Sequence, residues 1–422
     1  MDERKRSLRK EIVRLALPIA LQQFMTALVG ACDAIMLGKL SQDAMSAVSL
    51  ATQVTFVFNL FMFAFMAGEN MFVAQYYGKG DYTGISQVFS LVTKICGCIA
   101  VVFLTGTLFF PGQLMRILTN EETLIVLGSE YLRVIGISYV FSGIAQTFLA
   151  IMKNCGAVNM STLINGVMVI LNIVLNAVFI FGLSGFPKMG IKGAAIGTLT
   201  ARSLEFLIVL FYVAKIDKKV RVFDGGLLRG TFTAENRKLC RDFIKVSTPV
   251  ILSGLVWAIS IPMQTAILGH LSSDAIAANS VATTFFQYLK VIVVAIASAS
   301  SVVIGKSIGQ GDRNEVKAVG RTLSVIDISI GIILAIVLLM LRKPLLSMYN
   351  LTEEATILAD HLMIVMSVVM VGMSYQMPVS VGVIQGGGDT KFQMYMNLIS
   401  TWGIVMPLSF LAAFVWNFRW NG

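Results

Sequence analysis

The chain contains eleven stretches of mostly apolar residues that are long enough to cross a lipid bilayer as helices. About 20 such residues span the hydrocarbon core, and a helix satisfies its backbone hydrogen bonds internally there. The stretches cover residues 11–38, 46–76, 88–110, 129–153, 161–183, 191–214, 242–269, 276–305, 319–341, 356–384 and 392–416. This pattern predicts an all-α polytopic membrane protein.

Composition excludes the main alternatives. Charged residues make up 13% and apolar residues 56% of the 422 residues, whereas about 25% of a soluble domain is charged. These values exclude a soluble enzyme, a nucleic-acid-binding domain and a disordered chain. The two His and five Cys residues form no metal-ligand spacing. We therefore expect no enzyme activity, no cofactor and no nucleic-acid partner.

The distribution of basic residues predicts the orientation. With the N-terminus in the cytoplasm, 23 of the 33 Lys and Arg residues fall on the cytoplasmic side and 8 on the outer side. Cytoplasmic loops carry such an excess of Lys and Arg in membrane proteins. We expect a multi-pass protein of the plasma (inner) membrane with a cytoplasmic N-terminus.

The two halves of the chain are related by a constant shift in residue number, the one that brings Pro18 onto Pro249. We call this shift the repeat offset. Over residues 15–81 it gives 17 identities in 67 positions without a gap, where skewed apolar usage would give roughly 5. The matches include Asp81 with Asp312. The chain is therefore a tandem duplication.

We expect six helices in each repeat, an even number, so both repeats enter the membrane from the same side and are parallel. Such repeats are typical of transporters that bind substrate between their two halves. We expect a first lobe at 1–214, a cytoplasmic linker at 215–241 and a second lobe at 242–422 around a central cavity. The second lobe is short by one helix, so we expect a truncated or unstable product that lacks a twelfth helix.

Several motifs carry a family resemblance. They are Pro18 and Gln22, the run Asp33-Ala34-Ile35-Met36-Leu37-Gly38, the joint from Gln75 to Asp81, the pair Asn172 and Asn176, the segment Gly193-Ala194-Ala195-Ile196-Gly197-Thr198, and the run Gln385-Gly386-Gly387-Gly388-Asp389-Thr390. In this combination the chain resembles the multidrug and toxic compound extrusion (MATE) family of twelve-helix secondary transporters.

The resemblance implies export of small organic, often cationic, compounds in exchange for Na⁺ or H⁺. It also implies that the matching Asp, Asn and Thr positions couple the cation. Two alternatives stay open: a flippase for lipid-linked saccharide of the same superfamily, and a non-transporting receptor or scaffold. We expect the protein to be monomeric.

The residues point to the same coupling site. At 1.5 Å per residue, Asp33 lies about 8 Å, and Asn176 and Thr198 about 10 Å, inside the outer ends of their predicted helices. Asn172 lies one turn from Asn176 on the same helix face. We predict a cation-coupling site of Asp33, Asn172, Asn176 and Thr198, with Asp33 and Asn176 as Na⁺ ligands if sodium is used. In the duplicate half Gln264, Gly403 and Pro407 replace Asp33, Asn172 and Asn176.

Further polar residues at membrane depth are functional candidates, because such groups are costly there. Glu69, Lys290, Gln53 and Gln264 are candidates for the substrate path. Arg202 and Glu205 are three residues apart, so we expect a structural charge pair. Pro18 and Pro249 interrupt the first helix of each repeat and are candidate hinges.

Overall fold

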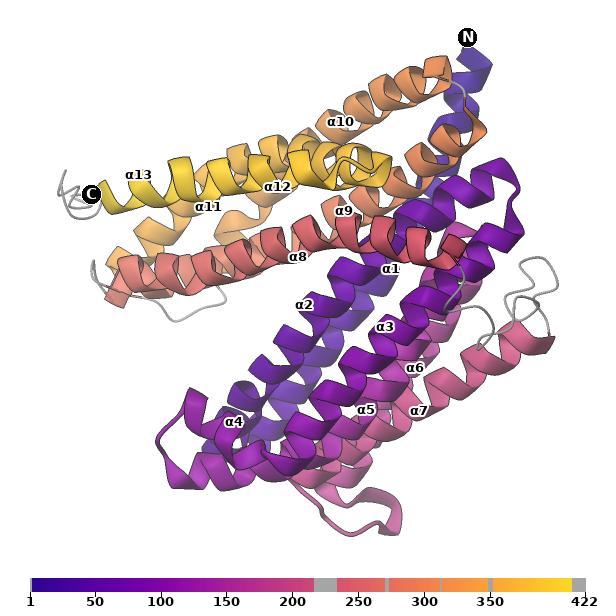
Figure 1. The fold of residues 1–422 in the computed structure, drawn as a ribbon. Helices are drawn as coiled ribbons and strands as arrows, with labels where there is room; N and C mark the ends of the chain where they lie inside the picture. Colours follow the sequence, from indigo (N-terminus) through magenta and orange to yellow (C-terminus); the bar gives the residue numbers. More distant parts are fainter. Residues whose placement is uncertain (1, 216–233, 270–272, 312, 348–351, 412–422) are drawn as a thin grey trace. The chain divides into compact units, whose positions relative to one another are not determined.

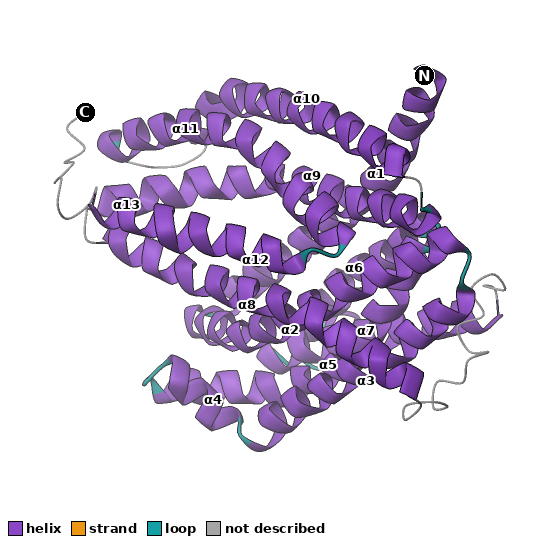
Figure 2. Cartoon of the chain, turned by 45° about the horizontal axis from the view of Figure 1, so that its top comes forward, coloured by secondary structure: helices purple, strands orange, loops and turns teal. Residues whose placement is uncertain are grey.

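The computed structural model is helical throughout its described parts, with no strand in them (Figures 1 and 2). It describes residues 2–215, 234–269, 273–311, 313–347 and 352–411. Within these ranges, ten helices are long and apolar enough to cross a membrane. The predicted all-α polytopic class is confirmed.

The first half of the chain forms seven α-helices. They are α1 (Asp2–Leu40), α2 (Gln42–Lys79), α3 (Tyr82–Phe109), the short α4 (Pro111–Leu118), α5 (Glu122–Asn154), α6 (Val158–Phe181) and α7 (Ile191–Lys215), with a 3-10 turn η1 (Leu183–Gly185) before α7. The sequence did not predict α4, which is too short to span a bilayer and starts at a proline, a residue favoured in the first turn of a helix.

The second half repeats the pattern. It contains α8 (Ala234–Gly269), α9 (Ser273–Gln310), α10 (Arg313–Leu346), α11 (Glu353–Met377), the π-helix η2 (Pro378–Gln385), α12 (Thr390–Leu398), a second π-helix η3 (Ile399–Val405) and α13 (Met406–Phe410). The last three follow one another directly and correspond to the predicted stretch 392–416. The end of that stretch, and the residues on which the missing twelfth helix was argued, lie outside the described residues.

The internal repeat is also present in the positions at which the helices begin. The repeat offset brings Gln42, at the start of α2, onto Ser273, at the start of α9. It also brings Tyr82 of α3 onto Arg313 of α10, and Glu122 of α5 onto Glu353 of α11, again at the helix starts. A duplication seen in one part of the sequence thus extends to three long helices of each half, α2, α3 and α5 in the first and α9, α10 and α11 in the second.

Several helices begin earlier than the apolar pattern predicts, because polar capping residues set their ends. The predicted stretch starts at 88, yet α3 begins at Tyr82, where the Asp81 carboxylate accepts a hydrogen bond of 2.9 Å from the Gly84 amide. Gly80 ends α2 in the left-handed region, with a φ of 73°. That conformation suits glycine, which has no Cβ to clash. Hydropathy therefore locates the part of a helix that crosses the membrane, whereas the capping residues locate the ends of the helix.

The chain groups into two compact units. One contains residues Leu21–Ile244, and the other contains Met1–Ala20 together with Lys245–Gly422. The predicted lobes, 1–214 and 242–422, differ from these units at the first helix of each repeat. The beginning of α1 belongs with the second repeat, and the beginning of α8 belongs with the first.

This exchange is made by equivalent residues in the two repeats. Ile12 of α1 is buried against Val303 of α9. Phe243 of α8 is buried against Phe72 of α2, with ring centroids 6.0 Å apart. The repeat offset brings Ile12 onto Phe243 and Phe72 onto Val303. Each repeat therefore makes the same contact once, through the start of its first helix.

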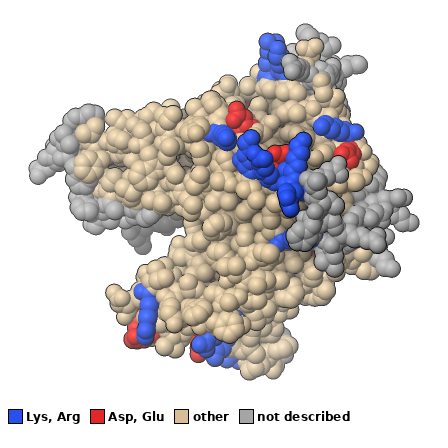
Figure 3. Space-filling model, in the orientation of Figure 1, with Lys and Arg blue, Asp and Glu red and all other residues tan. Residues whose placement is uncertain are grey.

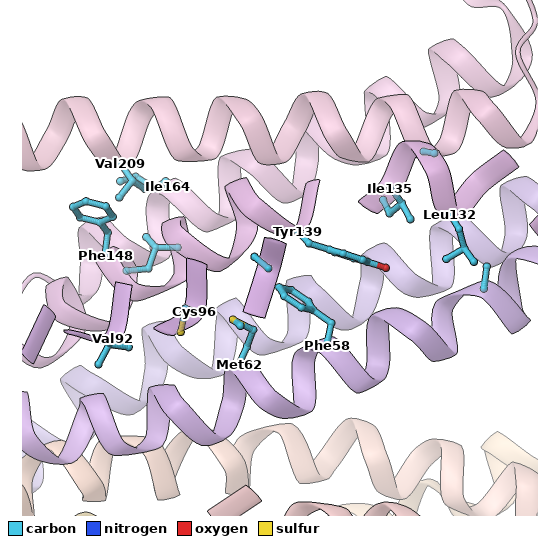
Figure 4. Packing of buried hydrophobic residues seen from close by; sticks show 14 of the residues in the cluster. Phe58, Met62, Val92, Cys96, Leu132, Ile135, Tyr139, Phe148, Ile164 and Val209 are labelled. Carbon is cyan, nitrogen blue, oxygen red and sulfur yellow. The ribbon is translucent and has the colours of Figure 1, made fainter. Parts of the chain in front are cut away.

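The core of the unit Leu21–Ile244 is aromatic at its centre. Phe58 and Tyr139 stack with ring centroids 4.6 Å apart, and Met62 and Cys96 pack beside them (Figure 4). Phe89 and Phe148 make an edge contact at 4.5 Å. Aromatic pairs in these geometries contribute about 0.5–1.5 kcal/mol each beyond the area they bury. This core holds α2, α3 and α5 together beneath the site described below.

Charged side chains avoid most of the visible surface. In Figure 3 the described Lys, Arg, Asp and Glu residues gather in a few groups, and broad uncharged surface separates them. Many large apolar side chains are exposed, such as Val102 at 68% and Val368 at 70%. Exposed apolar surface of this extent marks contact with a membrane or partner. Because the helices are long and apolar enough to span a bilayer, we attribute this exposed apolar surface to contact with lipid.

Candidate ion and substrate site

Asp33 of α1 and Asn176 of α6 are directly joined. The Asn176 side-chain amide donates a hydrogen bond of 2.7 Å to the Asp33 carboxylate, and a longer one of 3.4 Å to the Asn172 carbonyl oxygen. Asn172 in turn donates to the Thr198 hydroxyl of α7 at 3.2 Å. The four residues of the predicted coupling site, three at one depth and Asn172 one turn away, thus form one connected network within a single unit.

Two glycines allow α7 to pack this closely on α6. A Cβ at Gly197 would collide with the Asn176 side chain and backbone, and a Cβ at Gly193 would collide with the backbone of Phe179. Close helix contact through small residues is typical of membrane proteins. The Gly-x-x-x-Gly spacing in the segment 193–198 therefore brings Thr198 within reach of Asn172.

The network borders a cavity of about 150 Å³ inside the unit Leu21–Ile244. Its wall combines polar and aromatic side chains from α1, α2, α5, α6 and α7. The polar ones include Asp33, Thr52, Thr55, Asn59, Tyr131, Tyr139, Gln146, Asn172, Thr198 and Arg202. Small-ligand sites typically combine apolar walls with a few placed polar groups. The cavity can hold a hydrated cation or part of a small organic molecule.

Two charged residues line this cavity, and only one of them is available to a ligand. Arg202 donates a hydrogen bond of 2.7 Å to Glu205, one turn along α7. Glu205 is fully buried and lies 3.5 Å from the Asn165 amide. The Arg202 charge is therefore matched by its neighbour, as expected for a structural pair. Among the described residues, the Asp33 carboxylate accepts a hydrogen bond from the neutral amide of Asn176 and has no cationic partner, so the wall has an uncompensated carboxylate.

The donor set suits a small hard cation. The Asn176 carbonyl oxygen is buried with no hydrogen-bond partner among the described residues. Carboxylate, amide carbonyl and hydroxyl oxygens are the ligands that hard cations prefer. A proton on Asp33 would need none of the neutral oxygens. The geometry therefore accommodates either ion.

Sequence reasoning missed the aromatic side of the cavity. Tyr139 shares a hydrogen bond of 2.8 Å with Thr55, a residue of a different helix. Tyr131 lines the same wall. Neither tyrosine differs in sequence from an ordinary core aromatic residue. The one signal in the sequence was a polar tyrosine hydroxyl inside an apolar stretch. Such a group needs a hydrogen-bond partner within the membrane.

Glu69 lies outside the cavity. It is fully buried in the second half of α2, and neither carboxylate oxygen has a hydrogen-bond partner among the described residues. Lys153 of α5 lies close enough to attract it electrostatically. Beside them, Asn154 donates a hydrogen bond of 2.6 Å to Asn70. These residues form a second buried polar group, outside the cavity that Asp33 lines.

The remaining candidates are not brought together. Lys290 of α9 lies over the ring of Trp257 of α8, with its ammonium 5.8 Å from the ring centroid, in the unit that contains the second repeat. Gln53 and Gln264 are exposed. So are Gly403 and Pro407, the repeat equivalents of Asn172 and Asn176. The second repeat has no network that corresponds to Asp33 and its partners in its described part.

The MatE family profile matches residues 18–178 and 249–411. The two matched segments begin at Pro18 and Pro249, the pair that defines the repeat offset. Together they cover more than half of the chain. The chain therefore belongs to the MatE family.

Relatives and solved structures agree over nearly the whole length. The chain is 24% identical to the multidrug resistance protein MdtK of Edwardsiella ictaluri over 411 residues, which is 96% of this chain and 87% of the relative. It is 24% identical to the probable multidrug resistance protein NorM of Thermotoga maritima, covering 96% and 85%.

The fold matches an outward-facing multidrug resistance MATE transporter of the MOP superfamily with a TM-score of 0.87, at 20% identity, covering 98% of this chain and 90% of that one. It also matches a MOP superfamily transporter from Pyrococcus furiosus with a TM-score of 0.83, at 19% identity, covering 98% and 89%. The protein is a multi-pass membrane transporter of small molecules, not an enzyme, and its two repeats form the two-lobed fold of this family.

Proposed function

We propose that the protein exports organic, often cationic, compounds in exchange for Na⁺ or H⁺. The observation that carries the proposal is the Asp33–Asn176 hydrogen bond on the wall of the cavity. Two relatives are named as multidrug resistance proteins or probable ones. The same carboxylate is open both to a coupling ion and to a cationic substrate.

Exchange of substrate for the coupling ion follows if both compete for Asp33. A cationic substrate in the cavity is attracted by the ionised carboxylate, and an ion that binds Asp33 removes that attraction. A coupling ion changes the transport cycle only through such a difference in affinity between states. Binding of the ion from outside thus favours release of the substrate there. Asn176, Asn172 and Thr198 then hold the ion or reorient around the neutral carboxyl group.

The hinge and the membrane orientation complete the proposal. Pro18 lies two residues before Ala20, where α1 passes from one compact unit to the other. Proline weakens a helix by removing one backbone hydrogen bond, so bending there can follow occupancy of Asp33. We place the N-terminus in the cytoplasm and the protein in the plasma membrane as a monomer. Glu69, Lys290, Gln53 and Gln264 stay candidates for the substrate path.

The test is ethidium uptake into everted membrane vesicles that contain the protein. A Na⁺ gradient and a pH gradient are imposed separately, each against vesicles without the protein. We expect at least one gradient to drive uptake, and Asp33→Asn to abolish it. Equal uptake with and without each gradient would contradict the proposal.

A further inference from the structure

The second repeat contains a buried acid that the proposed coupling site does not use. Asp327 of α10 is fully buried, and neither of its carboxylate oxygens has a hydrogen-bond partner among the described residues. The Ser300 hydroxyl of α9 and the Gln385 carbonyl oxygen of η2 are also buried without a partner there. Counted from Arg313 at the start of α10, Asp327 lies about 21 Å along the helix, near the middle of the predicted span.

Packing places these three groups in one region. Leu323 of α10 and Ile304 of α9 belong to one apolar cluster, against which Val383 of η2 packs. Asp327 lies one turn after Leu323, and Ser300 one turn before Ile304, so each is on the clustered face of its helix. A Cβ at Gly382 would meet Ser300, at 2.6 Å from its Cβ. The η2 turn therefore lies directly on α9 at Ser300.

The internal repeat supports this placement. At the repeat offset, Ser300, Asp327 and Gln385 correspond to Glu69, Cys96 and Asn154. In the first repeat, Glu69 and Cys96 lie close enough for an electrostatic interaction. Asn154 is bonded to Asn70, the neighbour of Glu69. The two repeats thus hold one buried carboxyl group each at the same place in the fold, contributed by α2 in the first and by α10 in the second.

The two acids differ in their surroundings. Lys153 attracts Glu69, whereas the equivalent of Lys153 is Ile384. An ionised carboxylate that is buried without a partner costs several kcal/mol. A proton on Asp327 would remove the charge and supply a donor in a region where the Gln385 carbonyl oxygen has none. We propose that Asp327, with Ser300 and Gln385, is a proton-binding site of the second repeat.

Other charged groups of the described elements do not compensate Asp327. Along the elements that pack here, the nearest are Lys306 of α9, Arg321 of α10, and Lys10 and Arg14 of α1, which flank Ile12. Lys10, Arg14 and Arg321 are exposed. Lys306 lies six residues beyond Ser300, on a different face of α9. No charged residue occurs in η2, and the acidic and histidine residues of α11 lie in its first turns.

The π-helix η2 offers a route for the proton. Such segments are frequent at functional sites, and here Gly382 and Gly386 let η2 lie directly on Ser300 and Ser301. Movement of η2 away from α9 would open the acid to water, and its return would enclose it. Such a movement would let a proton reach or leave Asp327 without any change at Asp33.

The test is infrared spectroscopy of the purified full-length protein in lipid at neutral pH. Asp327→Asn keeps the shape, and Asp327→Cys inserts the residue that the first repeat has at this place, so at least one is expected to fold. We expect the difference spectrum to lose the C=O band of one protonated carboxyl group per chain. Asp43→Asn, which removes an exposed acid, should lose a carboxylate band instead and calibrates the assay.

Loss of a carboxylate band from the Asp327 variants at neutral pH would overturn the proposal. In the parent, raising the pH should convert the protonated band to a carboxylate band, and that conversion should be absent from both variants. The spectrum does not depend on transport, so failure of the proposed export at Asp33 would leave this result intact. If the pH-dependent conversion of the band persisted unchanged in Asp327→Asn, that result would also contradict the proposal.

Discussion

The side-chain amide of Asn176 lies 2.7 Å from the carboxylate of Asp33, although the two residues are far apart in the sequence. The amide of Asn176 is neutral, so it does not compensate the charge of an ionised Asp33, whereas a basic partner would make the pair neutral overall. When ionised, Asp33 therefore offers a net negative charge to a coupling ion or a cationic substrate. Arg202, on the same cavity wall, has its charge matched by Glu205.

Asp33→Asn tests the coupling role directly. The variant removes the titratable charge and keeps the size of the side chain, so it should insert and fold. We expect gradient-driven ethidium transport to fall to the level of vesicles without the protein. The matched control is Asp43→Asn at the exposed start of α2, which should transport at the parent rate. Parent-level transport by Asp33→Asn would place the coupling site elsewhere.

Asn176→Leu tests whether the network holds Asp33 in place. It removes the donor to Asp33 and leaves that acid without its amide partner, which costs about 1–3 kcal/mol for a buried group. We expect a lower melting temperature in detergent and loss of ion-driven transport. Asn176→Gln keeps the amide and should recover part of the stability. Full activity of Asn176→Leu would show that the hydrogen bond is dispensable.

Gly197→Ala tests the close approach of α6 and α7. The new methyl group would collide with Asn176, so the helices must separate, at about 1–3 kcal/mol for overpacking. Thr198 should then lose contact with Asn172. Gly97→Ala is the control, because a Cβ at Gly97 meets no atom within 4 Å. Thermal unfolding in detergent should separate the two variants, and equal melting temperatures would contradict the packing argument.

Arg202→Gln tests the charge pair on α7. It leaves Glu205 buried without its cation, and breaking a buried pair costs about 3–5 kcal/mol. The double variant Arg202→Gln with Glu205→Gln removes both charges and should regain most of the lost stability. Thermal unfolding of the parent, of the single variants Arg202→Gln and Glu205→Gln, and of the double variant forms a double-mutant cycle. If the two single effects simply add, the pair does not act as a unit.

Much of the architecture could be predicted from sequence, because the bilayer imposes local rules. Ten of the predicted spans are found as long apolar helices in the described residues, and the repeat offset is present in their boundaries. The depth of Asp33, Asn176 and Thr198 also followed from counting residues along each helix. Depth needs only the rise per residue and the ends of the span.

Partners across helices could not be predicted in this way. The depth of each residue did not show that Asn176 donates a hydrogen bond to Asp33 and that Asn172 donates one to Thr198. It did not show that Tyr139 faces Thr55, that Lys153 lies near Glu69, or that the start of each repeat's first helix packs on the other repeat. These contacts depend on the rotation and separation of packed helices. Glycines such as Gly197 set that separation through contacts with residues on another helix, and only the tertiary structure brings those residues together.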